Sequence, residues 1–518
     1  MNANLTGIDR KLTVAVIIMG IAIRSYLVFV LGWFQEDALV TARFGENLWH
    51  GIGFVYNEGS RILGFTSPLW TIILTPMVAL FPFHVFTLAG GVLCILLYCA
   101  CLYRMSLLME DLQFTPLARL WTFCVISLHD LMYSYTVGGM ETSLFLLLIL
   151  LAIHDFHQRS YYRSFLFSGL TILTRPEGVL LFLCLAVIYM KKEPVFPFRY
   201  IMLSVMVILP WIIFATAYYG SPVPQSAIAK GVSSKESVLA MLDAKALWGW
   251  LVGSWRMWLN ITGINFGSLP SGVQSIIFLV WTLPWFVGIR QLAKEKTGTM
   301  CLVGGFFVFY ASFFIFGSRT FCGWYAVPGI AMYSLVSALG VESLMVFVTR
   351  SMSNRKPVIL SLCKVMVVVV FVLFAMGKMR NYSIGQAYED KVRKPLGEYL
   401  YNKGRDDVTL MLEPIGYVAY LSKMKIIDLG GIVDPEIARR IKDSSRPWAI
   451  QVMKERSPDY IVLRNYEVRE NKFFAAGNQK LFQDDSDREW FKEHYALEKR
   501  FPYDRDRDYG MDLYKKIL

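Results

Sequence analysis

The stretch that decides the fold is residues 357–377, PVILSLCKVMVVVVFVLFAMG, followed at once by Lys378-Met379-Arg380. The run holds one charge and is long enough to cross a bilayer of about 30 Å. The composition changes at its end. Residues 1–378 contain 26 Lys and Arg and 16 Asp and Glu, whereas the much shorter stretch 379–518 contains 26 and 24. The first part therefore has a membrane-protein composition, and the second resembles a soluble domain.

The composition of the whole chain agrees with this division. Its 518 residues are 55% hydrophobic and 18% charged, with a mean hydropathy of +0.44. This excludes a disordered or fibrous protein and argues against an ordinary cytosolic enzyme. Of the net charge of +12, all but +2 belongs to residues 1–378, so no basic face for nucleic acid is indicated. All eight cysteines precede residue 378, so the tail has neither a disulfide framework nor a thiolate metal site.

Apolar runs predict eleven membrane spans, the first a signal anchor that Arg24 interrupts. They are 12–33, 84–103, 118–136, 142–157, 164–174, 178–190, 200–219, 270–289, 299–317, 325–348 and 357–377. The runs 164–174 and 178–190 are short, and we expect flanking residues to extend them. The proline-containing run 66–82 is predicted to be an interfacial or re-entrant helix.

Charge supports this topology. With a cytoplasmic N-terminus, the loops on the cytoplasmic side are short and basic, as the positive-inside rule requires. The opposite face receives half of the 16 acids in this part: Glu36, Asp37, Glu46, Glu58, Glu141, Glu177, Glu236 and Asp243. An odd number of spans then places residues 379–518 outside the cytoplasm.

The first outer loop, residues 34–70, opens on the adjacent carboxylates of Glu36 and Asp37. Apolar side chains recur there at four-residue spacing, at Val40, Phe44 and Leu48. This spacing predicts a short amphipathic helix over residues 37–49. At its start Asp37 can cap free backbone N–H groups. Carboxylates directly after a span also suit a general base, or a divalent cation site, although no ligand spacing requires a metal.

Other polar residues recur on the same face. They are Asn57, Glu141, Arg175, Glu177, Gln225, Lys230, Arg319, Trp324 and Tyr325, together with Arg43 and Arg61 in the first outer loop. Several such residues on one face are typical of a shared polar cavity. The structural alternative is that Arg175 and Glu177 pair with each other and shape a turn, and that Arg43 and Arg61 pair with nearby glutamates.

The sequence of the tail, residues 379–518, predicts a small α/β domain. Strand-like runs fall at 408–412, 425–428 and 460–463, with a last candidate strand around residues 512–514 and a helix containing Tyr417 and Tyr420. Acceptor binding, support of the outer cavity and a stabilising lid are all open roles. Arg505, Arg507 and the acids between them are most simply a solvated turn.

Several strings resemble membrane glycosyltransferases of the GT-C superfamily, and within it the arabinofuranosyltransferase-like group that includes the mycobacterial terminal arabinofuranosyltransferase. The first outer loop carries most of this resemblance, with Glu36-Asp37-Ala38, Arg43, Asn47-Leu48, Gly51-Ile52-Gly53-Phe54-Val55-Tyr56-Asn57 and Gly64-Phe65-Thr66-Ser67-Pro68-Leu69-Trp70. Later strings agree in order: Gly139-Met140-Glu141-Thr142, Arg175-Pro176-Glu177-Gly178, Pro224-Gln225-Ser226, Ala229-Lys230, Trp324-Tyr325, Glu413-Pro414-Ile415-Gly416, Asp428-Leu429-Gly430-Gly431 and Pro435-Glu436.

The resemblance implies a multi-pass enzyme of a bacterial inner membrane that moves a sugar from a polyprenyl-phosphate donor to an extracytoplasmic glycan, lipid or surface-protein acceptor. It implies a GT-C-type catalytic domain over residues 1–378, with its first outer loop at 34–83, and a periplasmic α/β domain over 379–518. A pentose such as arabinofuranose is the expected sugar. The absence of phosphate-loop and Rossmann motifs fits a lipid-linked donor.

The resemblance also implies roles for individual residues. The family's catalytic acid would fall on Asp37 or its neighbour Glu36, and a divalent cation at this pair is a further candidate. The donor phosphate would be bound by Arg175, Lys230, Arg319 and Arg43, with Arg61 in support. The sugar or acceptor would contact Glu141, Glu177, Asn57, Gln225, Trp324 and Tyr325. Relatives commonly have Asn where this chain has Gln225.

Three alternatives stay open at this point. The transferred sugar is a hexose or aminoarabinose; the protein is a lipid-linked glycan ligase or transporter; or it is a non-catalytic membrane scaffold. A transporter normally places charges within spans and repeats its halves. Here the acids gather on one face and no internal repeat is found.

Overall fold

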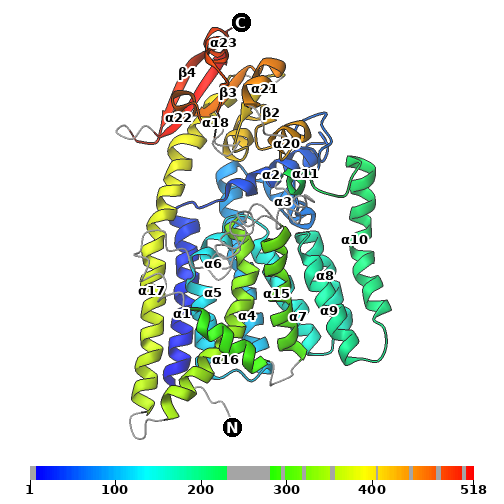
Figure 1. The fold of residues 1–518 in the computed structure, drawn as a ribbon, viewed down its shortest axis with the longest axis vertical. Helices are drawn as coiled ribbons and strands as arrows, with labels where there is room; N and C mark the ends of the chain where they lie inside the picture. Colours follow the sequence, from blue (N-terminus) through cyan, green and yellow to red (C-terminus); the bar gives the residue numbers. More distant parts are fainter. Residues whose placement is uncertain are drawn as a thin grey trace, which may run out of the picture. The chain divides into compact units, whose positions relative to one another are not determined.

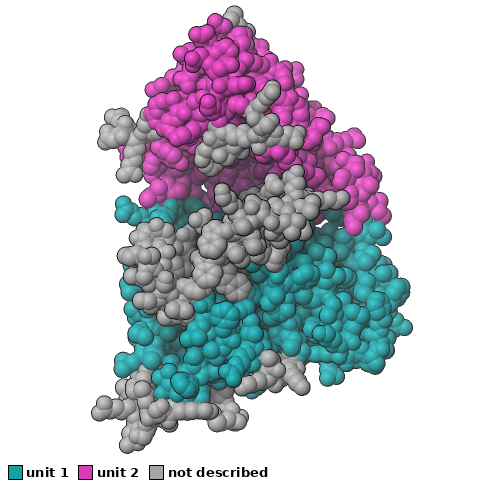
Figure 2. All heavy atoms as spheres, in the orientation of Figure 1, with its two compact units in different colours: residues 1–33, 87–211, 233–382 teal, residues 34–86, 212–232, 383–518 magenta. Residues whose placement is uncertain are grey.

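The computed structural model of the protein describes residues 7–229, 281–292, 298–317, 322–350, 356–403, 407–442, 447–473, 480–504 and 509–517. The chain forms two compact units, which Figure 2 colours separately. Unit 1 comprises residues 1–33, 87–211 and 233–382, and unit 2 comprises residues 34–86, 212–232 and 383–518. The first outer loop and the tail therefore belong to one unit.

Unit 1 is helical (Figure 1). Its helices are α1 (Gly7–Ser25), η1 (Tyr26–Val30), α4 (Phe83–Asp111), α5 (Pro116–Leu128), α6 (Asp130–Tyr135), α7 (Thr142–His157), α8 (Tyr161–Thr174), α9 (Gly178–Lys192), α10 (Phe198–Tyr219), residues 281–292, α15 (Gly298–Gly317), η3 (Gly323–Tyr325), α16 (Ala326–Arg350) and α17 (Lys356–Tyr388). The ends of α4, α10 and α17 contribute to unit 2. Helices α7, α8 and α9 pack in succession, and α5 packs against both α1 and α16.

Six helical segments of the described chain are long and apolar enough to cross a membrane. They are Asp9–Val30, Phe83–Asp111, Phe198–Tyr219, Gly298–Ile315, Gly323–Val348 and Ser361–Tyr401. Each coincides with a predicted span, and α8 and α9 extend the two short predicted runs by a few residues, as expected. The count of eleven spans and the side of the membrane on which each terminus lies stay predictions. Residues 270–280 of the predicted span 270–289 lie outside the described part.

The predicted span 118–136 is not one continuous helix. Helix α5 ends at Leu128, His129 is extended, and α6 begins at Asp130. The His129 side chain accepts a hydrogen bond from the Leu131 N–H (3.1 Å), which caps the new helix. A helix end inside an apolar unit leaves backbone carbonyls that need partners.

Arg24 supplies those partners from α1. Its Nη1 donates to the Ser127 carbonyl (2.9 Å), its Nη2 to the Ile126 carbonyl (3.1 Å) and its Nε to Thr136 Oγ1 (2.9 Å). The guanidinium also lies 3.5 Å from the centre of the Tyr98 ring. The charge that interrupts the first predicted span therefore stabilises the break in a later one.

Unit 2 combines the outer loop with an α/β tail. Its elements are α2 (Glu36–Trp49), α3 (Pro68–Leu80), α11 (Gln225–Ala229), η4 (Glu389–Arg393), α18 (Lys394–Tyr401), β1 (Thr409–Leu412), α19 (Tyr417–Ser422), β2 (Lys425–Asp428), α20 (Pro435–Lys442), α21 (Ala449–Arg456), β3 (Tyr460–Arg464), α22 (Asn465–Glu470), α23 (Asp485–His494), β4 (Tyr495–Pro502) and β5 (Gly510–Lys516). Helices α2 and α3 agree with the helices predicted near 37–49 and 66–82.

The tail is built on one sheet with strand order β2-β1-β3-β5-β4. Strand β1 is parallel to both β2 and β3, whereas β5 is antiparallel to β3 and β4. Strands β1, β2, β3 and β5 confirm the four predicted strands. Strand β4 was not predicted, because its charged run Glu498-Lys499-Arg500 lacks an apolar alternation. Side chains of β1 and β3 pack with α21 and α23 in the core, including Met411, Ile461, Val452 and Phe491.

We predict that Arg24→Met destabilises the protein. The Ser127 carbonyl would lose its guanidinium donor, and the Ile126 carbonyl would keep only the Tyr98 hydroxyl (3.3 Å), at a cost of about 2–4 kcal/mol. The measurement is the thermal melting of the detergent-purified protein by intrinsic fluorescence. Arg10→Met, at an exposed position of the same helix, is the control and should melt like wild type. Equal melting of Arg24→Met and wild type would show that the carbonyls at the α5 end do not depend on this guanidinium.

Candidate functional site

The first carboxylate of the outer loop is fully engaged within unit 2. Glu36 Oε2 accepts a hydrogen bond from Arg393 Nη1 (2.8 Å), and Oε1 accepts from the N–H groups of Gly416 (2.6 Å) and Tyr417 (3.1 Å). Burial raises the pKa of Glu36, whereas Arg393 and the two N–H groups oppose that rise. Glu36 therefore connects the start of α2 to η4 and α19.

Gly416 is required by this contact. A Cβ added there would lie 2.4 Å from the Glu36 carbonyl oxygen and 2.5 Å from Glu36 Oε1. Such distances exclude any larger residue without displacing the carboxylate. The contact with Glu36 thus explains why the string Glu413-Pro414-Ile415-Gly416 ends in glycine.

Asp37 lies beside Glu36 in the first turn of α2 and is half-buried. The N-cap position belongs to Gln35, one residue before the pair. Because both oxygens of Glu36 are taken by three donors, Asp37 is the better candidate for a carboxylate that accepts a proton. The same engagement argues against Glu36 as a metal ligand. Among the described residues, no three His, Cys, Asp or Glu side chains are grouped to hold a metal ion.

Arg43 makes its hydrogen bonds to backbone carbonyls. It donates to Tyr56 (Nε, 2.9 Å), Ala419 (Nη1, 2.7 Å) and Met424 (Nη2, 2.6 Å) and is 6% exposed. This arrangement holds the outer loop to the tail. The donor-phosphate role that the sequence predicts for Arg43 has no support from these contacts.

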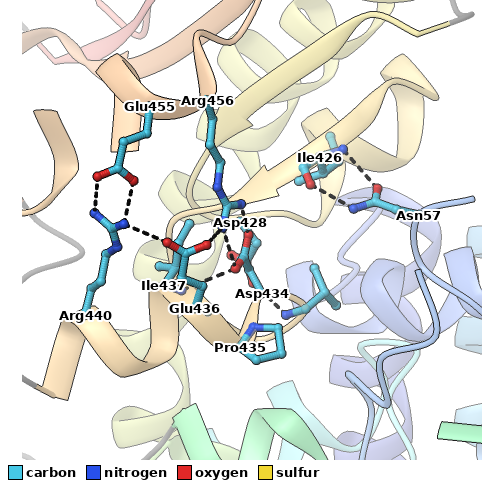
Figure 3. A network of polar contacts seen from close by, with 12 residues as sticks. Asn57, Ile426, Asp428, Asp434, Pro435, Glu436, Ile437, Arg440, Glu455 and Arg456 are labelled. Atoms are coloured by element: carbon cyan, nitrogen blue, oxygen red, sulfur yellow. Dashed lines mark hydrogen bonds and ion pairs between the residues drawn. The ribbon is translucent and has the colours of Figure 1, made fainter. Parts of the chain in front are cut away.

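The side chain of Asn57, like that of Arg43, forms hydrogen bonds with the backbone of the tail. Its amide donates to the Ile426 carbonyl (2.8 Å) and accepts from the Ile426 N–H (2.9 Å), so it pairs with β2 as a neighbouring strand would (Figure 3). Gln225 begins α11, where its N–H donates to the Leu63 carbonyl (2.7 Å) and its Nε2 to the Gly431 carbonyl (3.3 Å). Both side chains are buried and bridge separate stretches of unit 2.

A second charged cluster lies in unit 1, between α8 and α9. Arg175 donates from Nε and Nη2 to Glu177 Oε1 (3.1 and 2.9 Å), and its Nη1 lies 3.7 Å from Glu141 Oε1. These three side chains are between 2% and 8% exposed. The expected pairing of Arg175 with Glu177 is present, and Glu141 joins it from the start of α7.

Aromatic rings surround the Arg175 guanidinium. It lies 4.6 Å from the centre of the Tyr325 ring and 5.5 Å from that of Phe145. The Tyr310 hydroxyl donates to the Tyr325 carbonyl (3.0 Å), which fixes η3. Within the described part of the chain, Arg175 Nη1 is buried and has no hydrogen-bond partner. A buried guanidinium nitrogen in this state is a candidate site for an anionic group.

Trp324, also in η3, packs edge-to-face on Tyr135 at 5.7 Å between ring centres. Arg61 lies 4.8 Å from the centre of the Tyr218 ring. Lys230 and Arg319 lie outside the described residues. The structure therefore brings Glu141, Arg175, Glu177 and Tyr325 together in unit 1, and groups Glu36, Asp37, Arg43, Asn57 and Gln225 in unit 2.

Sequence reasoning missed Arg393. It follows a long apolar helix within the run Glu389-Asp390-Lys391-Val392-Arg393, which is indistinguishable by composition from the other charged runs of the tail. Its Nη1 also donates to Glu389 Oε1 (2.7 Å), so one guanidinium nitrogen joins two carboxylates. Only the three-dimensional pairing with Glu36 reveals its importance.

Residues 380–514 match a family model described as a domain of unknown function (DUF8728). A search of curated proteins finds no match. Among solved structures, ArnT from Cupriavidus metallidurans in the apo state is similar, with a TM-score of 0.53 and 11% identity over 97% of this chain and 98% of ArnT.

Two further structures are similar. ArnT from the same organism bound to undecaprenyl phosphate has a TM-score of 0.49 and 11% identity, over 98% of this chain and 97% of ArnT. The arabinofuranosyltransferase AftD from Mycobacteria has a TM-score of 0.42 and 13% identity, over 88% of this chain and 35% of AftD.

The apo ArnT comparison decides the fold, because it extends over nearly all of both chains. At 11% identity, what the two proteins share is architecture. The expected resemblance is thus confirmed at the level of the fold: this chain has the fold of ArnT.

Proposed function

We propose that the protein is a glycosyltransferase that moves a sugar from a polyprenyl-phosphate donor to a hydroxyl of an extracytoplasmic acceptor. The observation that carries the proposal is Arg175, a buried cation whose Nη1 has no hydrogen-bond partner among the described residues, in a chain with the ArnT fold. ArnT has been solved with undecaprenyl phosphate bound. A pentose such as arabinofuranose is the sugar we favour, from the resemblance of the outer-loop strings.

The donor needs positive charge at its phosphate. As the bond between the anomeric carbon and the phosphate oxygen breaks, negative charge grows on the leaving polyprenyl phosphate, and preorganised cations stabilise it. Arg175 alone is outnumbered by Glu141 and Glu177. We therefore keep Lys230 and Arg319 as the additional cations, and assign the two glutamates to holding the guanidinium and contacting sugar hydroxyls.

The acceptor needs a base. The acceptor hydroxyl gives its proton to a carboxylate as its oxygen forms the new bond to the anomeric carbon. Asp37 takes this role in our proposal because the oxygens of Glu36 already accept three hydrogen bonds. The first outer loop and the tail are then extracytoplasmic, as the distribution of charge along the sequence predicts.

We predict that Asp37→Asn lowers sugar transfer by at least about 100-fold, the usual contribution of a general base. The measurement is transfer from a synthetic polyprenyl-phosphate pentose by the purified protein, with release of polyprenyl phosphate as the readout. Glu58→Gln neutralises an exposed acid in the same loop and serves as the control. Near wild-type transfer by Asp37→Asn would remove Asp37 as the base.

We also predict that Arg175→Lys raises the donor KM by about ten- to a hundred-fold, because lysine keeps the charge but loses the planar fork that holds phosphate. Arg163→Lys, at a largely exposed position of α8, is the matched control. Melting temperature is measured in parallel. A lower melting temperature with an unchanged donor KM would mean that Arg175 only shapes the turn with Glu177.

A further inference from the structure

A cavity of about 780 Å³ lies within unit 2, on the tail side of Glu36. Its volume is within the range of small-molecule binding pockets. Four tyrosines line it: Tyr388, Tyr466, and Tyr503 and Tyr509 at the facing ends of β4 and β5. The transfer chemistry proposed above uses none of them.

The tyrosines form an aromatic wall. The ring of Tyr388 lies 5.8 Å from that of Tyr503 and 5.3 Å from that of Tyr509, centre to centre. Tyr509 is 51% exposed, so part of the wall is open to solvent. Aromatic faces that end in hydroxyl groups suit ligands that have both C–H surfaces and polar groups, and sugar rings are of this kind.

The rest of the lining carries paired charges. Arg393 pairs with Glu36 and Glu389, and Arg464 donates to Glu413 Oε2 (2.6 Å). These five charged side chains are between 12% and 23% exposed, so they present polar atoms with which ligand hydroxyls can exchange hydrogen bonds.

The charges of the lining residues indicate what charge the ligand carries. Three carboxylates and two guanidinium groups line the cavity, and burial raises the pKa of Glu389 to about 8, so the charges of the lining are nearly balanced at neutral pH. Each guanidinium is already matched by a carboxylate. An anionic ligand such as a phosphate or a uronic acid would therefore find no unmatched cation among these lining residues, whereas a neutral polyhydroxylated ligand needs none.

We propose that this cavity is a binding site for a neutral saccharide. That the saccharide is the acceptor of sugar transfer rests on the proposed function, but saccharide binding itself does not. The site would hold one or two sugar rings of a glycan chain against the tyrosines, with their hydroxyls on the partly exposed charged side chains of the lining.

The test is saturation-transfer NMR on the full-length protein in lipid nanodiscs, without donor. The probes are methyl α-arabinofuranoside and methyl α-mannopyranoside, with the methyl glycoside of glucuronic acid as the anionic comparison. We expect saturable binding of at least one neutral glycoside, and weaker binding of the glucuronide. The double variant Tyr503→Ala/Tyr509→Ala should weaken binding by about ten-fold through loss of the aromatic wall.

Tyr103→Ala removes a tyrosine that is 65% exposed on α4 and should bind like wild type. An unchanged melting temperature shows that the double variant is folded. The proposal is overturned if no neutral glycoside saturates, if the glucuronide binds most tightly, or if the double variant retains wild-type affinity.

The experiments distinguish a failure of the saccharide site from a failure of the proposed function. Asp37→Asn should retain saccharide binding even though it loses transfer. Saccharide binding by a protein that never transfers sugar would refute the transferase while leaving the binding site in place. If transfer does occur, the double variant should raise the acceptor KM about ten-fold with little change in kcat.

Discussion

The carboxylate of Glu36 is the contact on which unit 2 depends. It accepts hydrogen bonds from a guanidinium and two backbone N–H groups that all lie more than 350 positions away in the sequence. Removing a carboxylate from water is costly, and only a full set of donors offsets that cost. Loss of Arg393, or a side chain at Gly416, would therefore leave a buried charge with too few partners. The position of Asp37, the next residue, follows from this anchor.

The outer loop could not fold without the tail. Residues 50–67 form neither helix nor strand, so their backbone groups need partners elsewhere. Arg43 joins the Tyr56 carbonyl to two carbonyls of the tail, Asn57 pairs with Ile426, and Tyr56 donates its hydroxyl to the Ile415 carbonyl (2.5 Å). These bonds explain physically why residues 34–86 and 383–518 form one compact unit.

Hydropathy and charge predicted a large part of this fold, because helix length in a bilayer and strand alternation are local properties. These patterns predicted the positions of α2, α3, β1, β2 and β3 to within a few residues. The helix break at His129 was missed, since the guanidinium that stabilises it, on Arg24, lies more than 100 residues away. Strand β4 was missed because three consecutive charged residues interrupt its apolar pattern. The Glu36–Arg393 pair is likewise invisible to any local pattern, whereas the pairing of Arg175 with Glu177, two residues apart, was among the alternatives that the sequence left open.

The two neighbouring acids of the outer loop have different roles in our proposal. One anchors the loop and the other acts as the general base, and a single carboxylate could not easily do both. A general base must gain a proton during each turnover, and a carboxylate that holds three donors cannot do so without releasing them. If Glu36 were the base, each proton transfer would loosen the contact between α2 and α19. On the proposed function, Glu36 therefore keeps its hydrogen bonds as the anchor, and Asp37 changes its protonation on a backbone that the anchor holds still. The same division applies to the cations: Arg43 and Arg393 are used by the structure, which leaves phosphate binding to Arg175 with Lys230 and Arg319.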